Sequence, residues 1–170
     1  STLRGGYIDL DCGVRVLGSS WYGAAAPQAI EKIAAAMGEL PAGPGANVLL
    51  FHHGMEDQIA RYAGALRYEA VKPLKQAKVD YLALGPIHKH YAVDDWIFNP
   101  GSTEANNIEE TQFRRGVLLV ELENSQVKAE LKTDYRQRAA KRLKLTVRPQ
   151  AEIEDVREGA IATLQTAIDS

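Results

Sequence analysis

The sequence predicts an α/β fold, and three observations lead to this prediction. Two short, uninterrupted apolar runs, residues 47–51 and 81–84, are typical of strands buried on both faces of a sheet. Segments with apolar residues at helical spacing stand before and between these runs, as expected for helices that cover a sheet. A hairpin pattern near residue 120 adds further strands. The order of elements is therefore α/β followed by a β-rich end.

Individual elements follow from periodicity and from turn residues. Strands are predicted where apolar residues alternate or run together, at 13–17, 47–51, 81–84, 96–98, 116–122, 126–131 and 142–147. Helices are predicted where apolar residues recur every three or four positions, at 27–37, 55–66, 73–78 and 153–168. Pro27 suits the first turn of its helix, because proline lacks a backbone N–H that would otherwise have no partner there.

The composition is that of an ordinary globular chain. Its 170 residues are 45% hydrophobic and 25% charged, and the formal net charge of −2 excludes a uniformly basic nucleic-acid wrapper. No apolar run approaches the roughly 20 residues needed to cross a bilayer. A single cysteine, Cys12, fits a reducing compartment. We therefore expect a cytoplasmic protein without a membrane partner.

The four histidines fall into two pairs, each placed after a predicted buried strand. His52 and His53 directly follow the strand at 47–51, while His88 and His90 lie in the loop that leaves the strand at 81–84. In layered α/β proteins, ligands and metals are usually held at the carboxyl ends of parallel strands. If the two strands are parallel neighbours, the two pairs converge.

Four motifs stand in a fixed order between residues 45 and 125. They are His-His-Gly at 52–54, Asp-Tyr-Leu-Ala-Leu-Gly-Pro-Ile-His-Lys-His-Tyr at 80–91, Asn-Pro-Gly-Ser-Thr-Glu at 99–104 and Arg-Gly-Val-Leu-Leu-Val-Glu-Leu at 115–122. Together they resemble the carboxy-terminal half of calcineurin-like metallophosphoesterases, and most closely the DNA-repair exonuclease branch typified by SbcD. The resemblance implies a partial metallophosphoesterase-like layered sandwich over residues 1–135, followed by the start of a small α+β capping domain over 136–170.

The resemblance also implies a function. Members of that family hydrolyse phosphodiester bonds with two divalent metal ions, commonly manganese, held about 3.5–4 Å apart. By resemblance, His52 matches the lone metal histidine at its strand end, and His88 matches the second histidine of the family's glycine-histidine-x-histidine loop. The implied partners are DNA and an SbcC-like ATPase, and a homodimer is a further expectation.

The histidine loop departs from the family pattern at two positions. Pro86 stands where the family has its first loop histidine, and proline offers no ligand atom. His90 stands where relatives often have proline, two residues after His88. His90 is therefore a candidate substitute ligand, because residues two apart in an extended loop share a side. The alternative is that His90 is a surface residue and that the metal site has decayed.

The family's amino-terminal motifs, which supply most of the metal ligands, are absent from the chain. Asp9 and Asp11 lack the neighbours that those motifs require, and we expect them in an exposed turn. The chain begins at Ser1 with neither an initiator methionine nor a signal-peptide pattern. We therefore expect a portion of a longer enzyme, inactive in isolation, that does not hold a stable dinuclear centre by itself.

The net charge hides a strongly basic segment. Residues 126–149 carry eight Lys and Arg residues against Glu130 and Asp134, a balance of +6, so the rest of the chain sums to −8. Candidate contacts to DNA phosphates are Arg138, Lys141, Arg142 and Lys144. The alternative is a solvated strand whose lysines protect a sheet edge. A second hypothesis follows: a catalytically silent, phosphoesterase-derived module that binds DNA or a partner ATPase.

Overall fold

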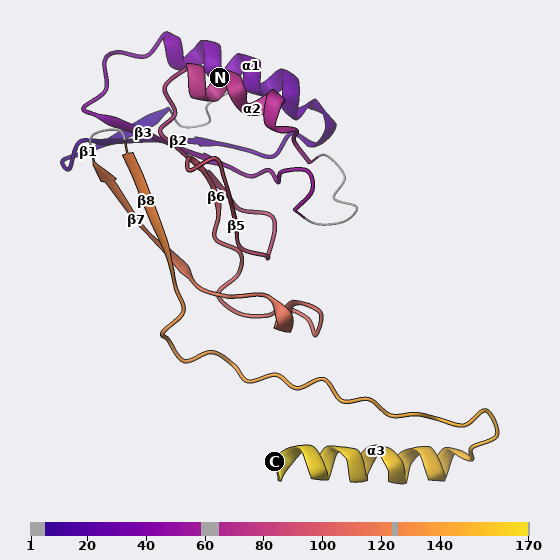
Figure 1. Cartoon of the computed structure of the whole chain (residues 1–170). Helices are drawn as coiled ribbons and strands as arrows, with labels where there is room; N and C mark the ends of the chain where they lie inside the picture. The colour runs from indigo at the N-terminus through magenta and orange to yellow at the C-terminus, as the bar shows by residue number, and fades with distance from the viewer. Residues whose placement is uncertain (1–5, 59–64, 124–125, 170) are drawn as a thin grey trace.

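The computed structural model describes residues 6–58, 65–123 and 126–169. Within these ranges the chain forms a six-stranded mixed sheet, a two-stranded hairpin and three α-helices (Figure 1). This architecture confirms the predicted α/β fold class. In the same ranges, no helix combines the length and the apolar composition needed to span a membrane.

The main sheet has a parallel centre and antiparallel edges. Its strands, in spatial order, are β1 (Tyr7–Leu10), β2 (Val14–Ser19), β3 (Ala46–Phe51), β4 (Tyr81–Leu84), β6 (Ile97–Asn99) and β5 (Tyr91–Val93). The neighbours β2, β3, β4 and β6 are parallel, whereas β1 and β5 pair antiparallel with β2 and β6. Both histidine pairs therefore leave neighbouring parallel strands at the same edge of the sheet.

Two helices cover one face of this sheet (Figure 1). A short 3-10 helix, η1 (Gly23–Ala25), leads into α1 (Ala26–Gly38), which has Pro27 in its first turn as predicted, and α2 (Tyr68–Gln76) packs beside α1. The strand register places alternate residues on the helical side, where they form one buried core with α1, including Leu17, Ile30, Ile33, Leu49 and Leu82. Burial under the helices thus explains one face of each apolar run, whereas the predicted burial of the strand at 47–51 on both faces is wrong, because Leu50 is half-exposed.

The opposite face of the sheet is apolar but only partly covered. The register brings together on that face Ile8, Val16, Val48, Tyr81, Leu50, Ala83 and Phe98. Leu50 is 49% exposed and Ile8 is 64% exposed, whereas Leu49 on the helical face is fully buried. The predicted hairpin, β7 (Val117–Glu123) and β8 (Gln126–Lys132), lies on this side (Figure 1).

Two predicted helices differ from the observed structure. Half of the segment 55–66, residues 59–64, lies outside the described residues, but its ends are not helical, because Met55 and Leu66 form a parallel bridge. The helix predicted at 73–78 is α2, which begins five residues earlier at Tyr68 and contains Pro73 inside it. Lys78 lies beyond its end with a positive φ of 63°.

The predicted strand at 142–147 is wrong. These residues are exposed and have no strand assignment, because no described strand pairs with them and the segment beside them is a helix. After β8 the chain runs away from the sheet as an extended segment and reaches the predicted terminal helix, α3 (Ile153–Ile168) (Figure 1). The domain division at residue 135 stays a prediction.

Candidate functional site

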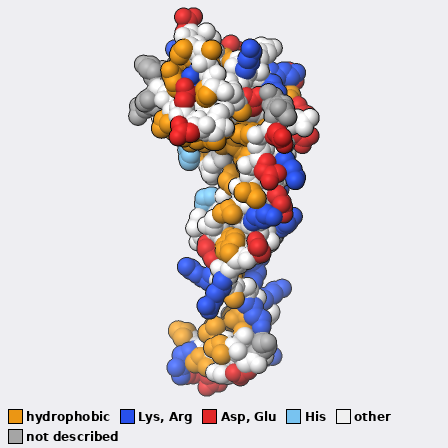
Figure 2. Space-filling view, turned by 90° about the vertical axis from the view of Figure 1, so that its left-hand side faces the viewer, with side chains coloured by type: hydrophobic (Ala, Val, Ile, Leu, Met, Phe, Trp, Pro, Cys, Tyr) orange, Lys and Arg blue, Asp and Glu red, His pale blue; other side chains and the backbone are white. Residues whose placement is uncertain are grey.

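The carboxyl ends of β2, β3 and β4 form one edge of the sheet, and His52 lies there. A depression of about 260 Å³ at this edge is lined by the ends of all three strands, by His52 and by Gly85. A Cβ atom added at Gly85 would lie 3.6 Å from His52 Nδ1, so the loops after β3 and β4 come close together. Histidine side chains are exposed along one side of the molecule in Figure 2.

His53 has a structural role, although it stands beside His52 in the sequence. Its side chain is fully buried, and its ring centroid lies 4.7 Å from that of Phe51. Its Nε2 atom accepts a hydrogen bond of 2.8 Å from the backbone N–H of Tyr22. The Nε2 lone pair is therefore already used, and the ring links the ends of β2 and β3.

A buried carboxylate orients His88. His88 Nδ1 lies 2.9 Å from Oε1 of Glu110, which is only 8% exposed. Glu110 also accepts hydrogen bonds from the backbone N–H of Asn106 and from the side-chain amide of Asn107, at 2.8 and 2.7 Å. The Asn106 N–H, and next the His88 ring, lower the pKa of Glu110, while burial opposes them. Glu110 is thus an ionised acceptor at neutral pH.

The contacts around His88 Nδ1 define its tautomer. The Asn106 side-chain nitrogen lies 3.1 Å from the same Nδ1 atom, and two donors cannot share one proton position. A donor from imidazole to an ionised carboxylate is the stronger bond, so we place the proton on Nδ1, pointing at Glu110. Beside a protonated Nδ1 the Asn106 amide serves as an acceptor, so its oxygen and not its nitrogen faces the ring. His88 Nε2 is left with a lone pair.

His90 follows the same pattern with a different acceptor. Its Nδ1 lies 3.0 Å from the backbone carbonyl oxygen of Asn99. A carbonyl oxygen only accepts, so the proton of the neutral ring is on Nδ1 and Nε2 carries a lone pair. Metal-ligating histidines almost always donate their second ring N–H to a carboxylate or a backbone carbonyl. His88 and His90 show one example of each.

The last residue of β6 and the turn that follows it hold the histidine loop in place. Asn99 is fully buried, and its amide donates hydrogen bonds to the carbonyl oxygens of Ile87 and Lys89 at 2.6 and 2.9 Å. The backbone N–H of Ser102 donates to the His88 carbonyl at 3.1 Å. Gly101 has a φ of 77°, and a Cβ there would lie 2.7 Å from the backbone nitrogen of His90. The predicted turn at 99–102 is therefore the scaffold of the loop.

The described residues do not by themselves fit a two-metal centre. Among them, no group of three or more His, Cys, Asp or Glu side chains is arranged to hold a metal ion. The predicted ligands His52, His88 and His90 follow the neighbouring strands β3 and β4 but do not form such a group, and their role as ligands stays a prediction. Asp9 lies in β1, not in the expected turn, because both carboxylate oxygens pair with the buried Arg15 guanidinium at 2.7 and 2.8 Å.

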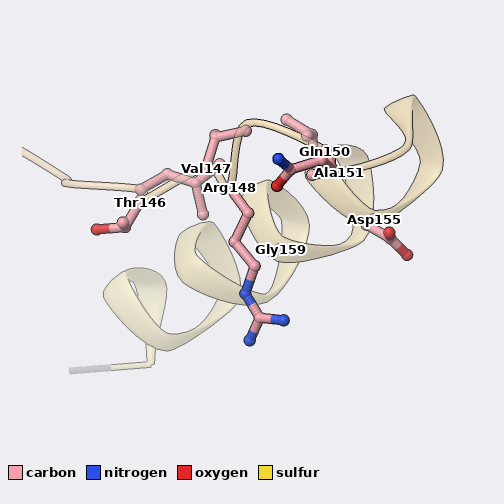
Figure 3. A pocket seen from close by; sticks show the side chains of 9 residues that line it. Thr146, Val147, Arg148, Gln150, Ala151, Asp155 and Gly159 are labelled. Carbon is pink, nitrogen blue, oxygen red and sulfur yellow. The ribbon is translucent and has the colours of Figure 1, made fainter.

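The predicted DNA-contacting residues lie far along the chain from the histidine loops. Arg138, Lys141, Arg142 and Lys144 are all exposed, on the extended segment that joins β8 to α3. A cavity of about 590 Å³ lies where this segment folds back against α3, with Arg148 and Asp155 among its lining residues (Figure 3). No histidine lines it, so it is separate from the strand-end site.

Residues outside the histidine pairs complete the candidate site. Glu110 and Asn106 lie more than fifteen positions after His88, so no local spacing rule could have found them. Comparisons with protein-family models and with curated proteins find no match to this chain. The functional argument therefore depends on the motifs and on the geometry of the two histidine loops.

Replacing Gly101 by alanine should destabilise the histidine loop. The positive φ and the close approach to the His90 nitrogen make a side chain unfavourable there, at a cost of about 1–3 kcal/mol in the free energy of unfolding. Gly38→Ala is the matched control, since nothing lies within 4 Å of a Cβ at the end of α1. Urea unfolding measures both variants, and equal losses would contradict the role assigned to Gly101.

The Glu110 carboxylate should make stability depend on acid pH. Its pKa is lower in the folded chain than in the unfolded chain, so its stabilisation is present above the unfolded pKa and is lost as the pH falls through the folded pKa. The free-energy gap between wild type and Glu110→Gln should therefore shrink from about pH 7 to about pH 2, across the ordinary glutamate pKa of about 4.3. Urea unfolding over this range tests it, with exposed Glu109→Gln as control. A gap that stays constant with pH would refute the assignment.

Proposed function

We propose that this chain is a portion of a metal-dependent phosphodiesterase, most specifically of a DNA-repair exonuclease that uses two divalent metal ions, and that it is inactive in isolation. One observation carries the proposal. The Nδ1 atoms of His88 and His90 are both engaged by oxygen acceptors, at 2.9 and 3.0 Å, which leaves two Nε2 lone pairs in one loop at a strand end. Imidazole nitrogen is a suitable ligand for manganese-like ions when carboxylates complete the set.

The partly covered face of the sheet supports the view that further structure completes the site. Parallel strands are normally buried on both faces, yet Leu50 of the central strand β3 is half-exposed. Val117 and Leu119 of the hairpin are also about half-exposed, at 49% and 52%. A layer packed on this face would bury these side chains and would lie beside His52, where the missing carboxylate ligands are needed.

Manganese binding tests the ligand assignment on this chain. We expect His88→Ala and His90→Ala each to weaken Mn²⁺ binding by at least about tenfold, because each removes an oriented nitrogen ligand. The decrease of the free Mn²⁺ signal in electron paramagnetic resonance, recorded at about pH 8 where imidazole is neutral, reports the affinity.

Lys89→Ala is the matched control for that titration, since Lys89 lies between the two histidines and is exposed. It should leave the Mn²⁺ affinity of the chain unchanged. Affinities that do not respond to either histidine, or that fall equally in all three variants, would refute the ligand assignment.

A second candidate function is a catalytically silent module that binds DNA or an SbcC-like ATPase. The observation in its favour is that Arg138, Arg142 and Lys144 extend from an exposed segment outside the sheet and its core. An extended basic segment can follow a phosphate backbone, and every phosphate that it neutralises releases a counterion.

Charge removal on this segment tests whether it contacts DNA. The double variant Lys141→Gln/Arg142→Gln should weaken binding to duplex DNA and reduce the salt slope by about 0.9 per lost phosphate contact. Lys32→Gln/Lys78→Gln removes the same charge from exposed positions elsewhere. Fluorescence anisotropy at several salt concentrations gives affinity and slope, and equal effects of the two double variants would remove the basic segment as a DNA contact.

A further inference from the structure

Arg115 lies two residues before β7, and the fold buries two of its guanidinium nitrogens without giving them a partner among the described residues. Its Nε and Nη1 atoms are buried and make no hydrogen bond within the described part of the chain. The ion pairs found among the described residues do not include Arg115. Arg115 as a whole is half-buried, and a cation that is partly withdrawn from water without a compensating group favours the binding of an anion.

Arg115 lines a small pocket that contains a second arginine. The pocket has a volume of about 140 Å³, several times the roughly 30 Å³ that one water molecule occupies in the liquid. Its polar lining consists of Glu104, Asn106, Asn107, Thr111, Arg115 and Arg138. Two arginines and two asparagines therefore line it, against a single acidic residue.

The pocket is built where the chain after β8 crosses the loop before β7. The Tyr135 hydroxyl donates to the Thr103 carbonyl at 2.5 Å, and the Gln137 side chain donates to the Arg115 carbonyl at 3.2 Å. Close packing fixes the next residue as well, since a Cβ at Gly116 would lie 2.4 Å from the Lys132 carbonyl oxygen. Arg115 is thus held in a fixed crossing and not on a mobile surface.

The one acid of the pocket does not neutralise Arg115. Both carboxylate oxygens of Glu104 accept the backbone N–H of Arg138, at 3.0 and 3.3 Å. No ion pair joins Glu104 to either arginine in the part of the chain that the structure describes. The pocket keeps a net positive charge, and the planar fork of a guanidinium matches a phosphate, which it can bind through two N–H donors.

The pocket shares a wall with the histidine loop. Asn106 and Asn107 line it, and the same two side chains contact His88 Nδ1 and Glu110 Oε1 at 3.1 and 2.7 Å. We propose that Arg115, with Arg138 at the rim, forms a phosphate subsite for the DNA strand, one side chain away from His88. That the phosphate belongs to DNA rests on the proposed function, whereas the anion site itself rests on the buried guanidinium.

Inorganic phosphate is the first probe. A ligand that binds only the folded chain raises its unfolding temperature, so phosphate should raise that temperature in wild type and in Arg114→Gln but not in Arg115→Gln. Arg114 is the matched control, because it is adjacent, exposed and carries the same charge. In ¹⁵N-correlated NMR spectra the Nε–H signal of Arg115, identified by its absence in Arg115→Lys, should shift as phosphate is added.

A single-stranded DNA oligonucleotide in the presence of EDTA is the second probe. We expect Arg115→Gln to weaken binding about tenfold, Arg115→Lys to weaken it less because the charge remains without the fork, and Arg114→Gln to have little effect. Equal losses in Arg114→Gln and Arg115→Gln would show a general charge effect and would overturn the subsite. The subsite would also be overturned if phosphate changed neither the unfolding temperature of the wild-type chain nor its Arg115 Nε–H signal.

These outcomes are independent of the manganese titration. A phosphate response that requires Arg115, together with Mn²⁺ binding that ignores His88 and His90, would support the subsite and refute the metal-ligand assignment. The reverse pair of results would refute the subsite and leave the proposed function standing. Since EDTA removes divalent metals from the DNA experiment, neither result depends on hydrolysis.

Discussion

The side chain of Asn99 determines the conformation of the histidine loop, and the candidate site depends on it. This fully buried amide ties the carbonyl oxygens of Ile87 and Lys89, the residues on either side of His88, to the end of β6. The Asn99 backbone carbonyl oxygen then accepts a hydrogen bond from Nδ1–H of the His90 ring. One residue thereby sets the path of the loop and the orientation of one imidazole, and Gly101 can approach the loop backbone because it has no side chain.

A second segment, residues 103–112, connects the residue that orients His88 to the positively charged pocket around Arg115. Glu110 orients His88, and Asn106 and Asn107 connect that pair to the pocket around Arg115. The His88 ring and the partly buried guanidinium of Arg115 thus lie on two sides of the Asn106 and Asn107 side chains. Such a pairing would suit the DNA strand that we propose as substrate, in which one phosphate is positioned while the next reaches the proposed metal ligands.

Sequence patterns predicted the parallel strands and both histidine positions, because buried strands leave continuous apolar runs that need no tertiary information. Only the family resemblance singled out His52 from His53, since the contact that engages the second ring comes from Tyr22, thirty-one positions away. Glu110 and Arg115 were missed because their roles come from contacts across loops. The alternation at 142–147 predicted a strand, but alternation describes only one chain and a strand also needs a neighbour.

The central claim is that His88 and His90 present unprotonated Nε2 atoms. Long-range ¹H–¹⁵N correlation spectra of the imidazole rings distinguish the two neutral tautomers directly, and single His→Gln variants assign the signals. The account predicts the Nδ1–H tautomer for both rings at about pH 8, where free imidazole is neutral. Nε2–H tautomers at His88 and His90 would contradict it, because neither ring could then act as the metal ligand proposed for it.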